Sequence, residues 1–250
     1  MGRSVGARDH SSKSGTIPSV DCWPLRGGAA CLDFANTVAW RPSAKPVDGL
    51  QTYDDLVLWG LHAALVSLPA SEGLLAHAAR DELAARATLD RAVALREAIF
   101  RLFAALAHGD AFAQEDLAMV NAVLAVAMAH AAVMRVEDGF ALRYPENEEA
   151  LALPLWNVAE SAAHLLVSGD WSRVRDCPGL DCGWLFLDRT KNGNRRWCDG
   201  ADCGNRGRVR AHYRRHHPTL SKSEERDRAT SPRAAGAPRQ PRIRGPGTVD

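Results

Sequence analysis

Four of the six cysteines in this chain lie in one short basic stretch, arranged as two pairs. Cys177 and Cys182 form the first pair and Cys198 and Cys203 the second; each pair is spaced C-x4-C, with fifteen residues between them. A short loop lets both thiolates of a pair point at one centre, and this double-pair pattern is close to that of structural zinc sites. The sequence therefore predicts one Zn²⁺ ion held by all four thiolates.

Two other arrangements compete with this four-thiolate site. Disulfides suit secreted proteins, but the N-terminal residues lack the apolar core of a secretory signal, so we expect a reducing, cytoplasmic setting. A Cys2His2 site would combine Cys198 and Cys203 with His212 and His216, but only eight residues separate Cys203 from His212. Such fingers use roughly twelve, and the first cysteine pair would be left unused. We favour four cysteines, which close the coordination sphere and give the metal a structural role.

The residues around the cysteines predict a small treble-clef-like finger. The apolar run 184–187 and the Asn192-Gly193 turn indicate a β-hairpin with a return strand over 195–197. A helix is expected over 206–216, with Asn205 as its cap. A segment this short buries too little apolar surface to fold alone. Metal binding can supply the missing stability, on the order of 10 kcal/mol.

The order of these motifs resembles the CGNR zinc finger of bacterial transcription regulators. The resemblance covers about 173–216 and is carried by CGWLF at 182–186, RRWC at 195–198 and CGNR at 203–206. Such fingers usually follow an ABATE domain, and LDFANT at 32–37 is similar to the opening of that domain. The resemblance implies a stress-linked transcription regulator. In such a regulator we expect the helical body to sense a ligand or mediate dimerisation.

Positive charge is concentrated in the finger. Residues 173–217 carry eleven Lys/Arg and five Asp, a net charge of +6, whereas residues 1–172 have a net charge of −8. Arginines repeated along one helical face are the expected footprint of a nucleic-acid backbone. DNA is therefore the expected partner, and the predicted contacts are Arg195, Arg196, Arg206, Arg208, Arg210, Arg214 and Arg215.

Other interpretations of this charge stay open. The arginines can also form a solvated face, balance the negative charge of a metal–thiolate centre, or bind an acidic protein. Arg206 has a second interpretation, contact with a metal-bound sulfur. RNA is a further candidate partner, because Trp184 and Trp197 could stack on bases.

Residues 21–170 read as a mainly α-helical domain with one small β-hairpin. The opening motif contains three polar residues, Asp33, Asn36 and Thr37, for which we favour a structural role over a ligand pocket. Cys22 and Cys31 are expected to be small apolar residues. Helices are expected over 30–38, from 52 to Pro69, over 71–108, 110–131 and 154–169, with a loop over 41–51 and the hairpin over 133–143.

The ends of the chain, and the motifs that the sequence lacks, limit the functions that we expect. Residues 1–20 and 218–250 are rich in small, polar and proline residues and are predicted to be disordered, the latter as a basic tail. No apolar run approaches the roughly 20 residues that span a membrane. Phosphate-loop and hydrolase motifs are missing from the sequence, so we expect no enzymatic activity. One finger reads few base pairs, and a homodimer would double the contact.

Overall fold

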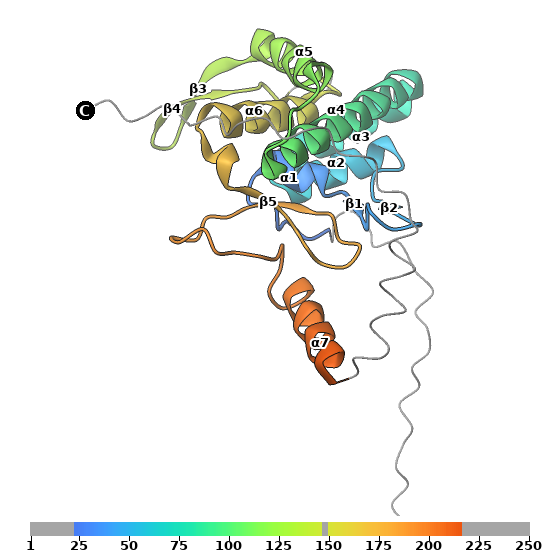
Figure 1. The fold of residues 1–250 in the computed structure, drawn as a ribbon. Helices are drawn as coiled ribbons and strands as arrows, with labels where there is room; N and C mark the ends of the chain where they lie inside the picture. Colours follow the sequence, from blue (N-terminus) through green and yellow to red (C-terminus); the bar gives the residue numbers. More distant parts are fainter. Residues whose placement is uncertain (1–22, 147–149, 217–250) are drawn as a thin grey trace, which may run out of the picture.

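The structure, a computed structural model, describes residues 23–146 and 150–216. The predicted disordered ends, 1–20 and 218–250, lie outside these described residues, as does Cys22. In Figure 1 the helices form a layered body, the finger lies below it, and the last helix stands away from it. The predicted class, mainly helical with small β-hairpins and a C-terminal four-cysteine cluster, is confirmed.

The body contains six helices and two small sheets among the described residues. In chain order the elements are α1 (Ala30–Ala35), β1 (Val38–Ala39), β2 (Val47–Asp48), α2 (Tyr53–His62), α3 (Leu68–Arg80), α4 (Glu82–His108), α5 (Gln114–His130), β3 (Ala132–Val136), β4 (Gly139–Arg143) and α6 (Leu153–Val167). The short 3-10 helix η2 (Asp170–Arg173) then leads into β5 (Val174–Asp176), β6 (Leu185–Leu187) and α7 (Cys203–His216).

Helix α4 is the centre of the body and packs against α1, α2, α3, α5 and α6. Apolar residues repeat along its inner face at helical spacing: Leu95, Ile99, Leu102 and Phe103 are fully enclosed. Helix α6 also packs on α5 and α1.

Several helix boundaries differ from the prediction; the first helix ends at Ala35, and Val38, predicted inside it, lies in β1. The segment 71–108 is not one helix, because Asp81 accepts a hydrogen bond from the Ala84 N–H (2.9 Å) and caps α4 just after α3 ends. Pro69 does not end a helix either; it lies in the first turn of α3, where its missing N–H costs nothing. Helix α2 has already ended at His62.

The predicted loop over 41–51 contains the short strand β2, which pairs antiparallel with β1 just before the loop and is held by a buried arginine. Arg96 of α4 is almost fully enclosed and donates to both carboxylate oxygens of Asp48, at 2.6 and 2.7 Å. Arg41 makes a two-bond contact with Glu97, at 2.7 and 3.1 Å. These ion pairs fix the loop against α4, and sequence periodicity does not reveal them.

The hairpin predicted inside the finger forms with a different partner. Strand β6 pairs with β5, which precedes the first cysteine, and not with residues 195–197. Asp188 holds the intervening segment as a loop by accepting from the N–H groups of Thr190 (2.9 Å) and Arg195 (3.0 Å). Val174, Leu185 and Leu187 are buried in the core of the body. The hairpin therefore belongs structurally to both parts of the chain.

Within residues 23–146 and 150–216, none of the helices has the length and apolar character needed to cross a bilayer.

Candidate metal centre

The four predicted cysteines converge on one point. The Sγ atoms of Cys177, Cys182, Cys198 and Cys203 all lie within 4.8 Å of one another, and all four residues are buried. Cys198 Sγ lies 3.7 Å from Cys182 Sγ and 3.6 Å from Cys203 Sγ. A tetrahedral ion with metal–sulfur bonds of about 2.3 Å separates its ligands by roughly 3.8 Å. The sulfur positions therefore fit a four-thiolate metal site.

Local structure positions each cysteine. Cys177 and Cys182 lie in the turn that joins β5 to β6, and the Cys177 N–H donates to the Trp184 carbonyl at 2.8 Å, which closes this turn. Cys203 begins α7. Gly179 lies against the cluster, where a Cβ atom would be 3.0 Å from Cys203 Sγ. A larger residue at this position would therefore press on the sulfur ligands.

Polar groups surround the sulfur atoms on their outer side. The Cys198 N–H donates to Cys177 Sγ at 3.4 Å, and the Arg206 guanidinium donates to Cys203 Sγ at 3.1 Å. Such donors stabilise metal-bound thiolates and hold them in position. Arg206 also pairs with Asp202 at 3.0 Å. The second interpretation of Arg206, contact with a ligand sulfur, therefore matches its position.

The cysteines influence one another's ionisation. Hydrogen bonds from the Cys182 and Cys198 thiols lower the pKa of Cys177 to about 2. The contact with Cys177 raises the pKa of Cys182 to about 12, and contacts with Cys177 and Cys182 raise the pKa of Cys198. Four thiolates can therefore share this space only around a cation, and a divalent ion satisfies that requirement.

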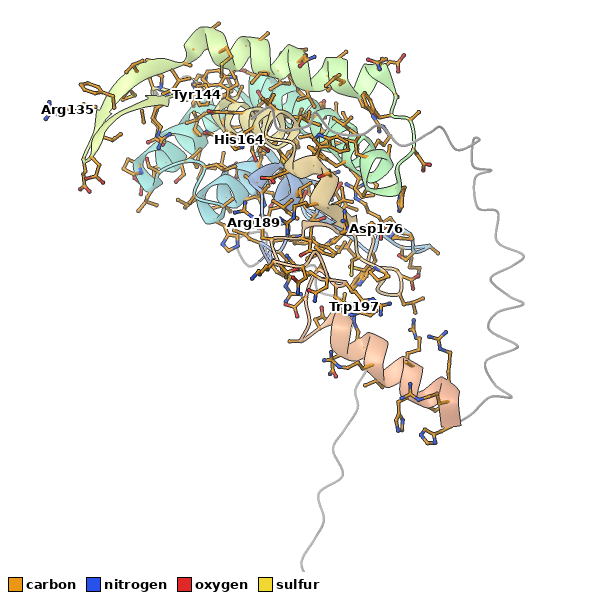
Figure 2. All side chains as sticks on the ribbon, turned by 60° about the vertical axis from the view of Figure 1, so that its left-hand side comes forward. Arg135, Tyr144, His164, Asp176, Arg189 and Trp197 are labelled. Atoms are coloured by element: carbon orange, nitrogen blue, oxygen red, sulfur yellow. The ribbon has the colours of Figure 1, made fainter. Side chains whose placement is uncertain are left out.

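Two tryptophans build the small core beside the cysteines. Trp184 is buried and its indole N–H donates to the Val38 carbonyl at 3.1 Å. Trp197 lies at the start of α7 (Figure 2) and packs on Gly204 and Gly207, where a Cβ at Gly207 would be only 2.6 Å from the ring. Trp184 is therefore part of the finger's core, and Trp197 is half-buried against α7.

The predicted nucleic-acid contacts divide into two groups. Arg195 turns inward, contrary to the expectation of a free cation, and donates to the carbonyl oxygens of Arg26 (3.0 Å) and Trp197 (3.1 Å). Arg206 is engaged at the metal centre. The others lie at the exposed surface and form no ion pair with a carboxylate among the described residues: Arg196, Arg208, Arg210, Arg214 and Arg215.

The helix that carries most of these arginines is longer than predicted. α7 begins at Cys203 and not after Asn205, so Asn205 lies inside its first turn and does not cap it. The Asp199 side chain instead orders the turn that leads into α7, because it accepts hydrogen bonds from the N–H groups of Ala201 (2.6 Å) and Asp202 (2.8 Å). Helix α7 therefore begins at one of the four clustered cysteines, and the position of this cysteine fixes the direction of the helix.

Comparison with known proteins agrees with this geometry. Residues 28–169, more than half of the chain, match the family model ABATE, described as "Putative stress-induced transcription regulator". The chain belongs to the ABATE family. Residues 173–216, which hold all four cysteines, match the CGNR zinc finger, so the predicted order of ABATE domain and CGNR finger is confirmed. A search of curated proteins finds no match.

The opening motif of the ABATE domain ties the domain to its CGNR finger. Asn36 is buried, and its side-chain amide makes two bonds to the backbone of Leu185, Nδ2 to the carbonyl (2.8 Å) and Oδ1 from the N–H (2.9 Å). Asp33 accepts from the Gly27 N–H at 2.6 Å. Thr37 donates to the Phe34 carbonyl at 2.8 Å. All three predicted polar residues therefore make backbone contacts, in keeping with the structural role that we favoured.

Burial raises the pKa of two side chains in helix α1. Loss of solvation raises the pKa of Asp33 to about 6, although backbone N–H groups lower it in part. Burial also raises the pKa of Cys31 to about 12, which keeps this thiol protonated and unreactive.

Sequence reasoning missed the segment that precedes the ABATE motif. The Gly27 carbonyl accepts from the Leu187 N–H of β6 at 2.7 Å, and Trp23 donates to the Asn36 carbonyl at 2.7 Å. Arg26 pairs with Asp199 (3.1 Å), which directly follows Cys198 in the CGNR finger. The adjacent glycines Gly27 and Gly28 were the available signal, since paired glycines mark close backbone approach.

Proposed function

We propose that this protein is a zinc-dependent, DNA-binding transcription regulator whose CGNR finger contacts the phosphate backbone through α7. The observation that carries the proposal is one groove. Arg206, Arg210 and Arg214, four residues apart on α7, line the same hollow of about 480 Å³. Repetition every four residues places three guanidiniums on one face of a helix. Such a stripe matches the charge pattern of a nucleic-acid backbone.

The cations of this groove differ in availability. Arg210 and Arg214 are exposed and pair with no carboxylate among the described residues, whereas Arg206 is held by Asp202 and Cys203. We therefore assign phosphate contact to Arg210 and Arg214, supported by Arg196, Arg208 and Arg215 on the neighbouring surface. Arg206 links the groove to the metal centre.

The ABATE domain contributes an aromatic side chain to the same groove. Trp40, from the loop between β1 and β2, lines it and is 46% exposed. Its φ angle of 51° lies in the left-handed region, which bulky residues rarely adopt. Strained residues of this kind persist where function requires them. We assign Trp40 to packing against the sugar–phosphate backbone.

Zinc would have a structural role in this function. Cys177, Cys182, Cys198 and Cys203 would hold the ion, and a Zn²⁺ centre with four thiolates has no open position for a substrate. Bound there, the ion would cross-link the β5–β6 turn to the first turn of α7, and these four cysteines would then fix the direction of the arginine face. Four thiolates reserved for metal suit a reducing compartment, so we place this activity in the cytoplasm. The proposal assigns no catalytic step to this protein.

The first test is binding of the zinc-loaded full chain to duplex DNA over a salt series. Each phosphate contact contributes about −0.9 to the slope of log K against log salt. We expect a steep slope of roughly −3 to −5 if the exposed arginines of the finger make these contacts. Affinity that does not change with salt would contradict the proposal.

The second test removes the two free arginines of the groove. Arg210→Ala with Arg214→Ala should keep one zinc per chain but weaken DNA binding by at least about tenfold, since a hydrogen bond to a charged group is worth roughly 1.5–3 kcal/mol. The salt slope should fall by about 2. The matched control is Arg80→Ala with Arg91→Ala, which removes the same charge from exposed positions of α3 and α4.

One alternative uses the same charges. An acidic protein could occupy the arginine face in place of DNA, and the double variant would then leave DNA binding unchanged but abolish capture of nuclease-resistant partners. That outcome would replace DNA by protein as the partner of the finger.

A further inference from the structure

The β3–β4 hairpin stands apart from the rest of the body. Its two strands pair with each other over five residues each, from Ala132–Arg143 to Val136–Gly139. Among the described elements they pack extensively only on each other, and Figure 1 shows them extending beyond the end of α5. An isolated two-stranded hairpin is at best marginally stable in water. An exposed hairpin of this kind would therefore gain stability from a partner that covers it.

Three large apolar side chains and one arginine share an exposed face of this hairpin. The register places Val133 opposite Leu142 and Arg135 opposite Phe140, so these four side chains share a face. Val133 is 72% exposed, Phe140 74% and Leu142 47%. Large apolar side chains gathered on one exposed face mark interaction sites in soluble proteins.

The strand register also identifies the free backbone groups of β4. Glu137 and Asp138 form a two-residue turn, so Val136 and Gly139 are the hydrogen-bonded pair that closes the hairpin. Bonded and non-bonded pairs alternate along an antiparallel ladder. The N–H and C=O groups of Phe140 and Leu142 therefore point away from β3. They form an open edge that pairs with no other strand in the described part of the chain.

We propose that this hairpin is a self-association surface, on which β4 pairs antiparallel with β4 of a second copy about a two-fold axis at Ala141. In that register Phe140 faces Leu142 of the second copy, and their outward backbone groups form the hydrogen bonds. Gly139 faces Arg143 of the second copy, which brings the acidic turn at Glu137 and Asp138 beside an arginine. Small Ala141 meets its own copy on the axis, where no bulky side chain obstructs approach.

The alternative edge, β3, fits less well. A two-fold axis at Met134 would place Arg135 opposite Val133 of the second copy, a cation beside an apolar side chain. It would also move the acidic turn away from Arg143. Apolar cross-strand pairs and opposite charges favour an antiparallel pairing, whereas mismatched pairs do not. The residue pattern therefore selects β4.

The inference is independent of DNA binding. Arg135 on the hairpin and Trp197 beside α7 lie at opposite ends of the molecule (Figure 2). Two β4-paired copies therefore keep both arginine faces free, and either proposal can fail without the other.

The first test is the molar mass of the full chain by sedimentation over a concentration series. Two five-residue strands bury less area than a permanent dimer interface, so we expect a reversible rise from one to two chains. Phe140→Lys with Leu142→Lys should raise the midpoint concentration at least about tenfold, because each apolar cross-strand pair is replaced by like charges. The control is Leu83→Lys, which adds a lysine at an apolar α4 residue that is 82% exposed. A monomer at every concentration, or a dimer unaffected by the double lysine variant, overturns the proposal.

The second test measures the register itself. Directly opposed residues of a non-bonded antiparallel pair have Cα atoms about 4.5 Å apart, within the range of a disulfide. Ala141→Cys should therefore give a covalent dimer on mild oxidation, at a rate at least about tenfold above that of Leu83→Cys. Equal rates for the two variants would show that β4 does not pair with its copy, even if a dimer forms elsewhere.

Discussion

The ABATE domain and the CGNR finger are stabilised in different ways. The ABATE domain encloses a large apolar core around α4, whereas the finger has only a few apolar side chains around four cysteines. The apolar side chains of its hairpin, Val174, Leu185 and Leu187, are buried in the ABATE core. We therefore expect the finger to depend on two supports, a metal ion and its neighbour, whereas the ABATE domain has a large core of its own.

This difference indicates which changes should unfold the finger alone and which should destabilise both the finger and the ABATE domain. The seam consists of backbone contacts from Gly27 and Asn36 to β6, together with the shared core. Loss of metal should release α7 and the cysteine loops, but loss of the seam should affect both parts together. Four changes to the protein distinguish these cases, and their effects should decrease in the order in which they follow.

Removing the metal should have the strongest effect. Chelation, or Cys198→Ser, should abolish zinc binding and disorder the cysteine loops, since metal binding contributes on the order of 10 kcal/mol to such fingers. The helices of the ABATE domain should persist by circular dichroism. Cys31→Ser is the control, because this buried thiol lies in the ABATE core and its loss should leave one zinc per chain. Loss of the whole helical signal on chelation would show that the two parts are not separable.

Breaking the buried ion pair of the ABATE domain should come next. Arg96→Ala should lower the free energy of unfolding by roughly 3–5 kcal/mol, because it removes an enclosed guanidinium and leaves Asp48 without its partner. Zinc content should stay unchanged. Urea denaturation checks the loss, and Arg91→Ala, at an exposed position of the same helix, should change stability by less than about 0.5 kcal/mol. A parallel loss of zinc would mean that the finger depends on this loop.

Cutting the seam should have an intermediate effect on both parts. Asn36→Ala leaves the N–H and C=O groups of Leu185 without their side-chain partners, at a cost of roughly 2–3 kcal/mol. The melting of the helices and the release of zinc should both shift to lower temperature. Asn205→Ala, an exposed position on α7, serves as the control. If only one of the two transitions moved, Asn36 would support one part and not the junction.

The weakest effect should be a change in pH dependence. The folded state raises the pKa of Asp33 to about 6 from an ordinary value of 3.8, so the folded chain binds more protons than the unfolded chain between those values. Stability from this group is therefore greatest below pH 4 and falls as pH rises through 6. Asp33→Asn should remove this slope, because the amide does not titrate. Thermal melts of wild type and variant across this range check it, and parallel curves would contradict it.

The sequence predicted what depends on spacing and periodicity. Cysteine spacing indicated the metal site, and the 3.6-residue periodicity of the body indicated its helices. Strand pairing in the finger was predicted wrongly, because the Asn192-Gly193 turn signal is local and the choice of β5 by β6 depends on burial in a distant core. The turn of Arg195 toward carbonyl oxygens and the Arg96–Asp48 pair are likewise tertiary contacts, which periodicity cannot reveal.

The shared core has a practical consequence for anyone who studies the finger by itself. A fragment that starts at residue 173 would present Val174, Leu185 and Leu187 to water, with the backbone of β6 stripped of its contacts to Gly27 and Asn36. Such a peptide would tend to aggregate however well it chelates zinc. Failure of that peptide to shift DNA would therefore reflect its missing neighbour and would say nothing about the arginines of α7.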